Sequence, residues 1–168
     1  FKQFIREIPD WPKKGIGFKD ITPLLQNSVA FKVAVDELSK PFEDKGIDMV
    51  VGIDARGFIL AAAMAYKLGA GLAIVRKKGK LPWRTISREY ALEYASNVLE
   101  MHEDAIQPGQ TILLVDDVLA TGGTMAAAVD MVKQLGGSIS GLAFLTVLDF
   151  LKGKEMLGGL PIHTLIRY

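Results

Sequence analysis

The chain has 168 residues, 49% of them hydrophobic and 23% charged, which is ordinary for one globular domain. Its formal net charge of +1 argues against the strong positive field of a nucleic-acid-binding domain. The absence of cysteine excludes disulfides and thiolate metal sites and favours a reducing cytoplasm. The longest apolar run, residues 58–66, is about half of what spans a bilayer. We therefore expect neither nucleic acid nor a membrane as a partner.

The predicted elements follow one another along the whole chain. The first 25 residues hold three prolines and show no steady period, so we expect a packed irregular segment there. A helix is predicted at 28–42 with Ser28 as its N-cap, and an alanine-rich helix at 58–68 ends at Gly69. A third helix is predicted at 124–135. Residues 76–97 are charged, contain glycine and are only weakly periodic. The predicted strands are 49–53, 72–75, 98–101, 111–115, 139–148 and 161–168.

Strands that alternate with helices over this length predict an α/β domain with a mostly parallel, twisted sheet flanked by helices. In such sheets ligands bind beyond the carboxyl ends of the strands. Three predicted strand ends carry charge and, in two cases, glycine: Asp54-Ala55-Arg56-Gly57, Arg76-Lys77-Lys78-Gly79 and Asp116-Asp117. The sequence therefore predicts a binding site at this edge of the sheet.

The third of these ends leads into Ala120-Thr121-Gly122-Gly123-Thr124 and then into a predicted helix. The first amides of a helix lack partners within it and bind anions such as phosphate. The turn lacks the Gly-Lys-Ser/Thr ending of a nucleotide-hydrolysing P-loop. Asp116 and Asp117 would repel phosphate, but they can accept hydrogen bonds from hydroxyls, so a sugar phosphate with a vicinal diol fits. The alternative is a strand end capped by two solvated aspartates.

Five segments in order resemble the type I phosphoribosyltransferase family, and within it the adenine phosphoribosyltransferase branch. They are WPKKGIGFKDITPLL, VVGIDARGF, VRKKGKLP, EYALEY and ILLVDDVLATGGT. The resemblance spans nearly the whole chain and implies one domain, 1–168, with a base-recognising N-terminal hood at 1–27 and a mobile active-site loop at 79–94. It also implies transfer of a 5-phosphoribosyl group from phosphoribosyl pyrophosphate (PRPP) to adenine, giving adenosine monophosphate (AMP) and pyrophosphate in purine salvage.

The resemblance assigns PRPP binding to residues at the three strand ends. Asp116 and Asp117 would hold the ribose hydroxyls, and Arg56, also counted as catalytic, would meet the pyrophosphate with paired donors. A cis peptide bond is expected near Asp54-Ala55. For Lys77 and Lys80 a solvated basic loop is the alternative. The other implied PRPP-binding residues are Arg76, Lys77, Lys80, Ala120, Thr121, Gly122, Gly123 and Thr124.

Two further catalytic residues, Glu93 and Tyr94, are implied by the resemblance alone, because a solvated glutamate is the default for EYALEY as sequence. Adenine loses a proton as it bonds to the sugar, so a carboxylate base within reach is useful. Glu93 could instead stabilise a cationic sugar in the transition state. Tyr94 is expected to pack beside it.

Adenine recognition is assigned by the resemblance to the N-terminal segment and to the end of a later strand. Phe18 would stack on the base, the backbone of Gly17 and Lys19 would read its edge, and Leu148 would line the pocket. For Leu148, ordinary core is the alternative. Many family members carry an apolar side chain in place of Gly17 and arginine in place of Lys19.

The resemblance also implies Mg²⁺, bound mainly through PRPP near Asp116 and Asp117, and a homodimer, which is the commonest assembly. His102 and His163 lack the spacing of a metal pair. One alternative function is transfer to another base, such as hypoxanthine, guanine or orotate, against which FKDITPLL and EYALEY argue. The other is a non-enzymatic PRPP-binding regulator, for which we expect an added DNA-binding segment.

Overall fold

The computed structural model describes residues 1–168 except 12, 16, 93 and 94, and for 91, 92, 95 and 96 it describes the backbone alone. Within the described chain, the main sheet has seven strands in the order β5-β6-β4-β3-β7-β8-β9. The strands β4, β3, β7, β8 and β9 run parallel, and the β5–β6 hairpin joins antiparallel. Their bounds are β3 (Met49–Ile53), β4 (Gly71–Lys77), β5 (Thr85–Leu92), β6 (Ala95–His102), β7 (Thr111–Leu119), β8 (Ser138–Val147) and β9 (Ile162–Arg167).

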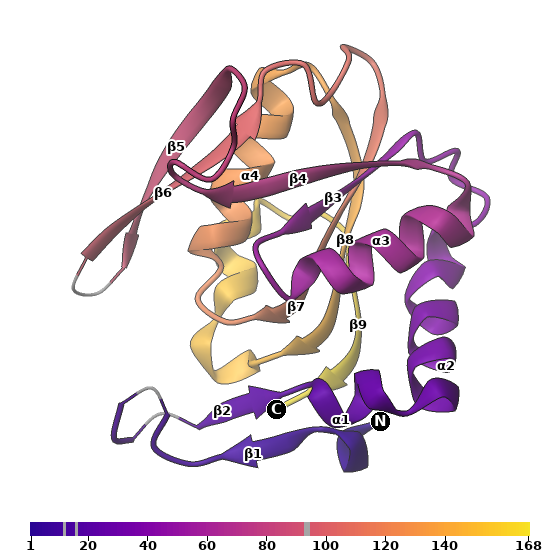
Figure 1. Ribbon diagram of the computed structural model, residues 1–168, viewed down its shortest axis with the longest axis vertical. Coiled ribbons are helices and arrows are strands. Elements are labelled where there is room, and N and C mark those ends of the chain that lie inside the picture. Colours follow the sequence, from indigo (N-terminus) through magenta and orange to yellow (C-terminus); the bar gives the residue numbers. More distant parts are fainter. Residues whose placement is uncertain (12, 16, 93–94) are drawn as a thin grey trace.

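Helices cover both faces of this sheet (Figure 1). The helices α1 (Thr22–Gln26), α2 (Ser28–Ser39) and α3 (Gly57–Leu68) pack on one face, and α4 (Gly123–Gln134) packs on the other. Successive side chains of a strand point to opposite faces. On β3, Val50 therefore enters the core under α2 and α3, and Val51 enters the core under α4. This burial on both sides explains the continuous apolar runs of the central strands, and the predicted α/β architecture is confirmed.

The helix predicted at 28–42 is present as α2 followed by the 3₁₀ turn η2 (Lys40–Phe42), but its predicted N-cap is wrong. The side chain of Asn27 accepts a hydrogen bond of 2.9 Å from the amide of Ala30, and Ser28 is already helical. Both residue types cap helices well, so the sequence alone could not separate neighbours.

The N-terminal segment is more regular than the sequence suggested. It holds the 3₁₀ turn η1 (Lys2–Phe4) and an antiparallel pair, β1 (Arg6–Ile8) and β2 (Phe18–Asp20). Cross-strand ion pairs join Lys19 Nζ to Glu7 Oε1 at 2.7 Å and Arg6 to Asp20 at 3.5 Å. Strands of three residues are too short to show a period of two, which is why they were not predicted. In Figure 1 this hairpin lies below the main sheet.

Two further differences concern the strands around the predicted site. No strand was predicted at 85–92, where β5 pairs with β6 along its length. The side chains of residues 85–90 are half-buried or exposed and give no clear alternation. Strand β7 continues to Leu119, so Asp116 and Asp117 lie within the strand rather than at its end. Its partner β3 accompanies it only to Val115, which leaves the edge of β7 beside the two aspartates free of β3.

The 3₁₀ turns η3 (Asp149–Leu151) and η4 (Gly153–Leu157) connect β8 to β9. None of the helices in the described ranges combines the length and apolar character needed to cross a membrane.

Candidate active site

A cleft of about 660 Å³ lies at the carboxyl ends of β3, β4 and β7. Figure 1 shows these ends between the β1–β2 hairpin and the β5–β6 hairpin. Residues from the hood, from the β3–α3 connection, from β4 and from β7 meet here, although they are far apart in the sequence. The predicted site residues that line the cleft are Phe18, Arg56, Lys77, Asp116, Asp117, Ala120 and Thr124.

Asp117 of the acid pair on β7 is buried, only 4% exposed, and Asp116 is half-buried. Burial raises the pKa of Asp116 well above its usual value, and the neighbouring Asp117 carboxylate raises it further; burial also raises the pKa of Asp117, which Arg56 opposes. The amide of Asp117 donates a 2.8 Å hydrogen bond to Oδ1 of Asp116. A Cβ at Gly57 would lie 2.7 Å from that oxygen. Helix α3 can therefore begin beside Asp116 only because residue 57 is glycine.

Arg56 connects this acid pair with the hood. Its Nε lies 2.8 Å from Oδ2 of Asp117, but the N–H does not point at the oxygen, so Oδ2 has no hydrogen-bond partner within the described chain. The contact is therefore an ion pair. Arg56 also donates a 3.2 Å hydrogen bond to the carbonyl of Lys19, and its guanidinium carbon lies 4.5 Å from the centre of the Phe18 ring. One side chain thus touches both the acid pair and the aromatic ring.

The turn between β7 and α4 has the form expected for anion binding. Gly122 adopts φ +88°, a left-handed conformation that favours glycine. The first helical hydrogen bond runs from the amide of Ala126 to the carbonyl of Gly122, so the amides of Gly123, Thr124 and Met125 have no partner inside the helix. Ala120, Thr121, Gly122 and Thr124 line a small cavity of about 70 Å³ that opens here. The turn can therefore present several donors to one anionic group.

The basic segment after β4 forms a turn in which the amide of Lys80 donates to the carbonyl of Lys77. Lys77 lines the cleft, whereas Arg76 and Lys80 do not. Arg76 turns towards Asp54, with Nε 3.1 Å from Oδ2, and donates a 3.4 Å hydrogen bond to the carbonyl of Lys80. The peptide bond between Asp54 and Ala55 is cis, as expected from the sequence.

Comparison with known proteins assigns this cleft to a family. The family model of the phosphoribosyl transferase domain matches residues 24–155. The adenine phosphoribosyltransferase of Thermotoga neapolitana is 58% identical over 167 residues, which are 99% of this chain and 98% of that protein. The chain belongs to the adenine phosphoribosyltransferase branch of the phosphoribosyltransferase family. The family expected from the sequence is confirmed, and with it a pentosyltransferase enzyme.

Solved structures agree with this assignment. The crystal structure of adenine phosphoribosyltransferase from Rhodothermus marinus matches with a TM-score of 0.96 at 47% identity, covering 99% of this chain and 96% of that chain. The Saccharomyces cerevisiae enzyme, solved with adenine and an imino-altritol bisphosphate, matches with a TM-score of 0.92 at 37% identity, covering 97% and 94%. The fold is therefore that of the type I phosphoribosyltransferases.

In this phosphoribosyltransferase the residues expected to recognise the base are only partly gathered. Phe18 lines the cleft together with Trp11, whose ring meets it edge-on with centroids 4.4 Å apart. Gly17 and Lys19 do not line the cleft, and neither does Leu148, which is half-buried just after β8. A side chain at position 17 would press on the carboxylate of Glu7, since a Cβ would lie 3.2 Å from Oε1.

An ion pair of Glu7 with Lys19 lies beside Gly17 in the β1–β2 hairpin. Glycine at 17 leaves room for the Glu7 carboxylate, which holds Lys19 Nζ at 2.7 Å. The same ammonium lies 4.1 Å from the centre of the Tyr168 ring, a distance at which a cation and an aromatic face attract. Lys19 is therefore fixed by its side chain away from the cleft, while its backbone carbonyl contacts Arg56.

Gly153 packs against the turn between β7 and α4, and this contact was not predicted. A Cβ at Gly122 would overlap the carbonyl oxygen of Gly153, and a Cβ at Gly153 would overlap the carbonyl oxygen of Ala120 and lie 2.9 Å from the amide nitrogen of Gly122. The two backbones approach this closely because neither residue has a side chain. The contact joins residues 31 positions apart, so no local pattern could indicate it.

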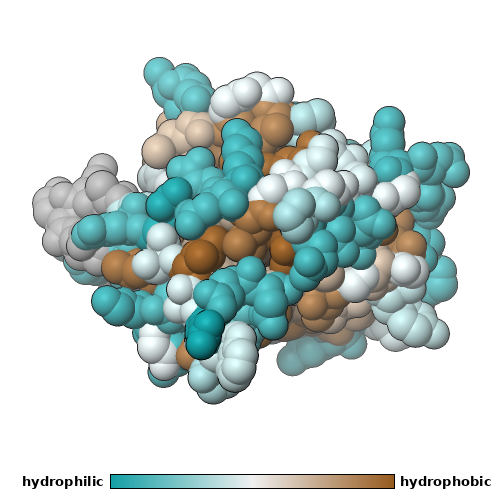
Figure 2. Space-filling model, turned by 90° about the horizontal axis from the view of Figure 1, so that it is seen from above, coloured by the Kyte–Doolittle hydropathy of each residue, from teal (hydrophilic) through white to brown (hydrophobic). Residues whose placement is uncertain are grey.

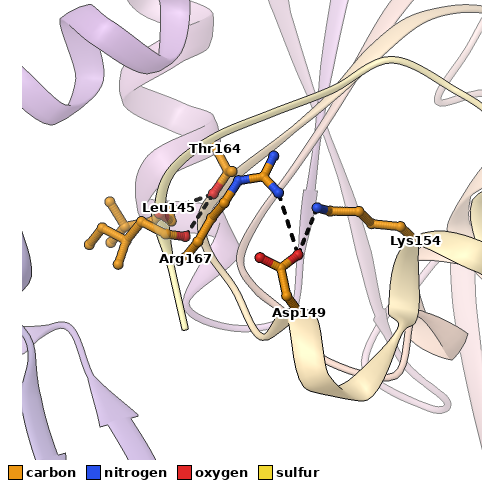
Figure 3. A network of polar contacts seen from close by, with 6 residues as sticks. Leu145, Asp149, Lys154, Thr164 and Arg167 are labelled. Atoms are coloured by element: carbon orange, nitrogen blue, oxygen red, sulfur yellow. Dashed lines mark hydrogen bonds and ion pairs between the residues drawn. The ribbon is translucent and has the colours of Figure 1, made fainter.

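The segment that carries Gly153 is held by a charged network, shown in Figure 3. Asp149 Oδ1 lies 2.7 Å from Lys154 Nζ and 3.4 Å from Arg167, and the lysine holds the pKa of Asp149 below its usual value. The amide of Asp149 also donates to the carbonyl of Tyr168, whose ring contacts Lys19. The segment that packs against the β7–α4 turn is thus connected, through Tyr168, to the N-terminal hood.

Sequence reasoning also missed residues that line the cleft, among them Trp11, Tyr90 and Asn97. Tyr90 and Asn97 face each other across the β5–β6 register, in the stretch where no strand was predicted. Asp54 could have been found, because it belongs to the charged strand end that contains Arg56. The expected catalytic residues Glu93 and Tyr94 lie outside the residues that the structure describes.

Proposed function

We propose that this protein transfers the 5-phosphoribosyl group of PRPP to adenine and releases AMP and pyrophosphate. The observation that carries the proposal is the meeting, in one cleft, of an acid pair, a turn rich in free amides and an aromatic ring. Asp116 and Asp117 suit the sugar, the turn from Ala120 to Thr124 suits the 5′-phosphate, and Phe18 suits a purine. Relatives that are more than half identical carry the name of this activity.

The sugar and its phosphate are the best-supported parts of the proposed complex. The edge of β7 beside Asp116 and Asp117 is free of β3, so two neutral hydroxyls can approach there. Oδ2 of Asp117 accepts no hydrogen bond within the described residues, and it becomes available to a hydroxyl once Arg56 turns to the diphosphate. A hydrogen bond from a hydroxyl to an ionised carboxylate contributes about 1.5–3 kcal/mol. The amides of Gly123 and Thr124, at the positive end of the α4 dipole, would hold the 5′-phosphate.

The leaving pyrophosphate needs positive charge, which two segments supply. Lys77 already lines the cleft, and Arg76 and Lys80 belong to the same turn. Arg56, from the connection between β3 and α3, also lines the cleft and can form paired hydrogen bonds with phosphate oxygens. As the bond from the sugar carbon C1′ to the pyrophosphate oxygen breaks, this charge stabilises the oxygen that gains the electron pair.

The incoming base is proposed to stack on Phe18, with the backbone of Gly17 and Lys19 at its edge and Leu148 near its other face. A ring nitrogen of adenine forms the new bond to C1′ and loses its proton. Glu93, beside Tyr94, is proposed either to accept that proton or to stabilise the positive charge on the sugar. Closure of the segment 79–94, which includes strand β5, would exclude water from the reactive sugar.

Magnesium fits the donor set of this site. Mg²⁺ is usually held by one or two carboxylates together with substrate phosphates rather than by an all-protein cage. Asp116 and Asp117 supply the carboxylates, and the described residues contain no cluster of three or more His, Cys, Asp or Glu suited to a metal. When bound through PRPP, the ion would neutralise charge that develops on the leaving pyrophosphate.

We further propose that the enzyme acts as a homodimer. Figure 2 shows hydrophobic side chains gathered in the middle of the face seen from above, within a mainly hydrophilic surface. On the outer side of α3, Ile59 and Tyr66 are exposed, the latter to 92%, and Leu72 is exposed on the adjoining β4. Apolar surface of this kind favours a second copy of the chain. The cytoplasmic location expected from the sequence stays a prediction.

The experiment that tests the proposed function is an assay with PRPP, Mg²⁺ and each of adenine, hypoxanthine, guanine and orotate. We expect rapid formation of AMP with adenine and no comparable product with the other bases. Product with another base alone would assign a different specificity. Binding of PRPP without product from any base would contradict an enzymatic function and favour a regulator.

A further inference from the structure

A buried glutamate lies behind the basic turn and is not used by the proposed mechanism. Glu100 is on β6 and is only 8% exposed. Its Oε2 accepts a 2.9 Å hydrogen bond from the amide of Gly79, and it forms no ion pair within the described ranges. Its neighbour Leu99 lines the cleft, so Glu100 points to the other face of the strand. A buried carboxylate is costly unless its hydrogen bonds offset the loss of water, which indicates a specific task.

The hydrogen bond from Gly79 fixes the turn that carries the lysines. The turn closes with the amide of Lys80 donating to the carbonyl of Lys77 at 3.3 Å, and Gly79 adopts φ +80° at its third position. In such a four-residue β-turn the closing hydrogen bond uses the amide of the fourth residue, so the amide of the third residue, Gly79, stays free for another acceptor. The carboxylate of Glu100 accepts the hydrogen bond of the Gly79 amide. The amide of Lys78 donates to the carbonyl of Val98 on the same strand. The turn is therefore attached to β6 at two consecutive amides.

The position of Glu100 in the sheet determines which side chains of the anchored turn face the cleft. In the β4–β6 register Glu100 lies opposite Arg76, and Leu99 lies opposite Lys77. Arg76 and Glu100 therefore share one face of these two strands, and Lys77 shares the opposite face with Leu99, which lines the cleft. Anchoring the turn from behind keeps Lys77 facing the cleft.

We propose that Glu100 is a positioning residue for the pyrophosphate group: by binding the Gly79 amide, it holds the Lys77–Lys80 turn where its lysines meet the diphosphate of PRPP. The inference rests on the proposed function, because the turn has this task only if a diphosphate occupies the cleft. The carboxylate acts through the backbone of Gly79 and does not touch the substrate. The proposed role requires an acceptor oxygen at the distance from the backbone that a glutamate side chain provides.

Three substitutions of Glu100 separate the effect of its side-chain length from the effect of its charge. Glu100→Gln keeps an acceptor oxygen at the same reach and removes the charge, whereas Glu100→Asp keeps the charge and shortens the side chain by one methylene. Glu100→Ala removes both. Glu103→Ala is the matched control, because Glu103 follows β6 on the same hairpin and is exposed, with only a 3.8 Å pair to Arg84.

The measurement is a set of steady-state constants in both directions, with a melting curve for each variant. We expect Glu100→Ala and Glu100→Asp to raise KM for PRPP and for pyrophosphate at least about tenfold, which is about 1.4 kcal/mol. KM for adenine and AMP should stay within about twofold, because the base and sugar contacts are elsewhere. Glu100→Gln should stay within about threefold of the parent for all four substrates, and Glu103→Ala should match the parent.

A uniform rise in all four constants would mean general damage to the fold and would overturn the proposal. So would an unchanged KM for pyrophosphate in Glu100→Ala, or a glutamine variant as impaired as the alanine variant. If the parent protein makes no AMP, the proposed function fails; calorimetric titration of the same proteins with magnesium pyrophosphate then tests Glu100 separately. Absent or equal pyrophosphate affinity in parent and Glu100→Asp would overturn the role of Glu100.

Discussion

The guanidinium of Arg56 lies 2.8 Å from the carboxylate of Asp117 while it also covers the ring of Phe18 at 4.5 Å. One side chain thus occupies space beside the residue proposed to bind the sugar and against the ring proposed to bind the base. A diphosphate offers a guanidinium more and stronger acceptors than a single buried carboxylate does. Donor binding is therefore expected to draw Arg56 towards the pyrophosphate and to leave Asp117 and Phe18 free for the sugar and the base.

Replacing Arg56 should weaken the binding of the diphosphate. We expect Arg56→Ala to raise KM for PRPP and for pyrophosphate at least about tenfold, or about 1.4 kcal/mol, and Arg56→Lys to recover only part of this loss because an ammonium cannot form the paired contact. Steady-state kinetics in both directions measures the effect. Equal constants for the lysine variant and the parent would show that charge alone suffices.

Replacing Asp116 should increase stability and impair donor binding. Its pKa in the folded protein is raised above 3.8, so above that pH the folded state binds more protons than the unfolded state, and stability falls as pH rises towards the raised pKa. Asp116→Asn removes this pH-dependent loss of stability and keeps an acceptor oxygen for the amide of Asp117. At pH 7 we expect Tm to rise by about 2–4 °C, or roughly 1 kcal/mol, and KM for PRPP to increase.

The stabilising effect of Asp116→Asn should shrink as the pH is lowered to about 4, where the parent carboxyl is protonated in the folded state and partly so in the unfolded state. Melting curves from pH 4 to pH 8 show this directly. A variant that is less stable than the parent at pH 7 would mean that the ionised carboxylate stabilises the fold.

Replacing Gly153 should disturb the phosphate turn. A Cβ there would overlap the carbonyl of Ala120 and crowd the amide of Gly122, and overpacking of this kind costs about 1–3 kcal/mol. We expect Gly153→Ala to lower Tm and to raise KM for both PRPP and AMP about tenfold. Gly158→Ala is the control, since position 158 has φ +59° but open space around a Cβ. It should lose stability without losing phosphate affinity.

Replacing Glu93 tests the catalytic role proposed for it. Glu93→Ala should lower kcat at least about a hundredfold, the range typical of a lost acid–base group, and should leave the dissociation constant of PRPP nearly unchanged. Rapid-quench assays give the rate, and equilibrium titration gives the affinity. A reduction in kcat of less than threefold would remove Glu93 from the mechanism.

Replacing Tyr66 tests the proposed dimer. Its ring is almost fully exposed on α3, and Tyr66→Glu would place a charge inside an interface formed there, which is unfavourable when desolvated. Sedimentation equilibrium should show a dimer for the parent and a shift of at least about tenfold in the dissociation constant for the variant. A monomeric parent, or an unchanged variant, would place the interface elsewhere or exclude it.

Much of the fold could be predicted because its signals are local. The central strands contain short apolar runs, such as 72–75 and 112–115, bounded by glycine or polar residues. Helix α3 is an alanine-rich segment that ends at Gly69, which adopts φ +65°. The three-residue strands β1 and β2 and the strand β5 carry no comparable pattern. They form because their hairpin partners supply hydrogen bonds, and this pairing leaves no periodic pattern within the strand itself.

The sequence by itself determined the family, the acid pair and the phosphate turn, because each is carried by a contiguous motif whose chemistry follows from residue types. Only the tertiary structure decided which side chains face the cleft. It turns Arg76 towards Asp54 and places Arg56 between Asp117 and Phe18. It also sets Gly153 against Gly122. These contacts join segments that are far apart in the chain, and their geometry depends on how the sheet and its connections pack in three dimensions.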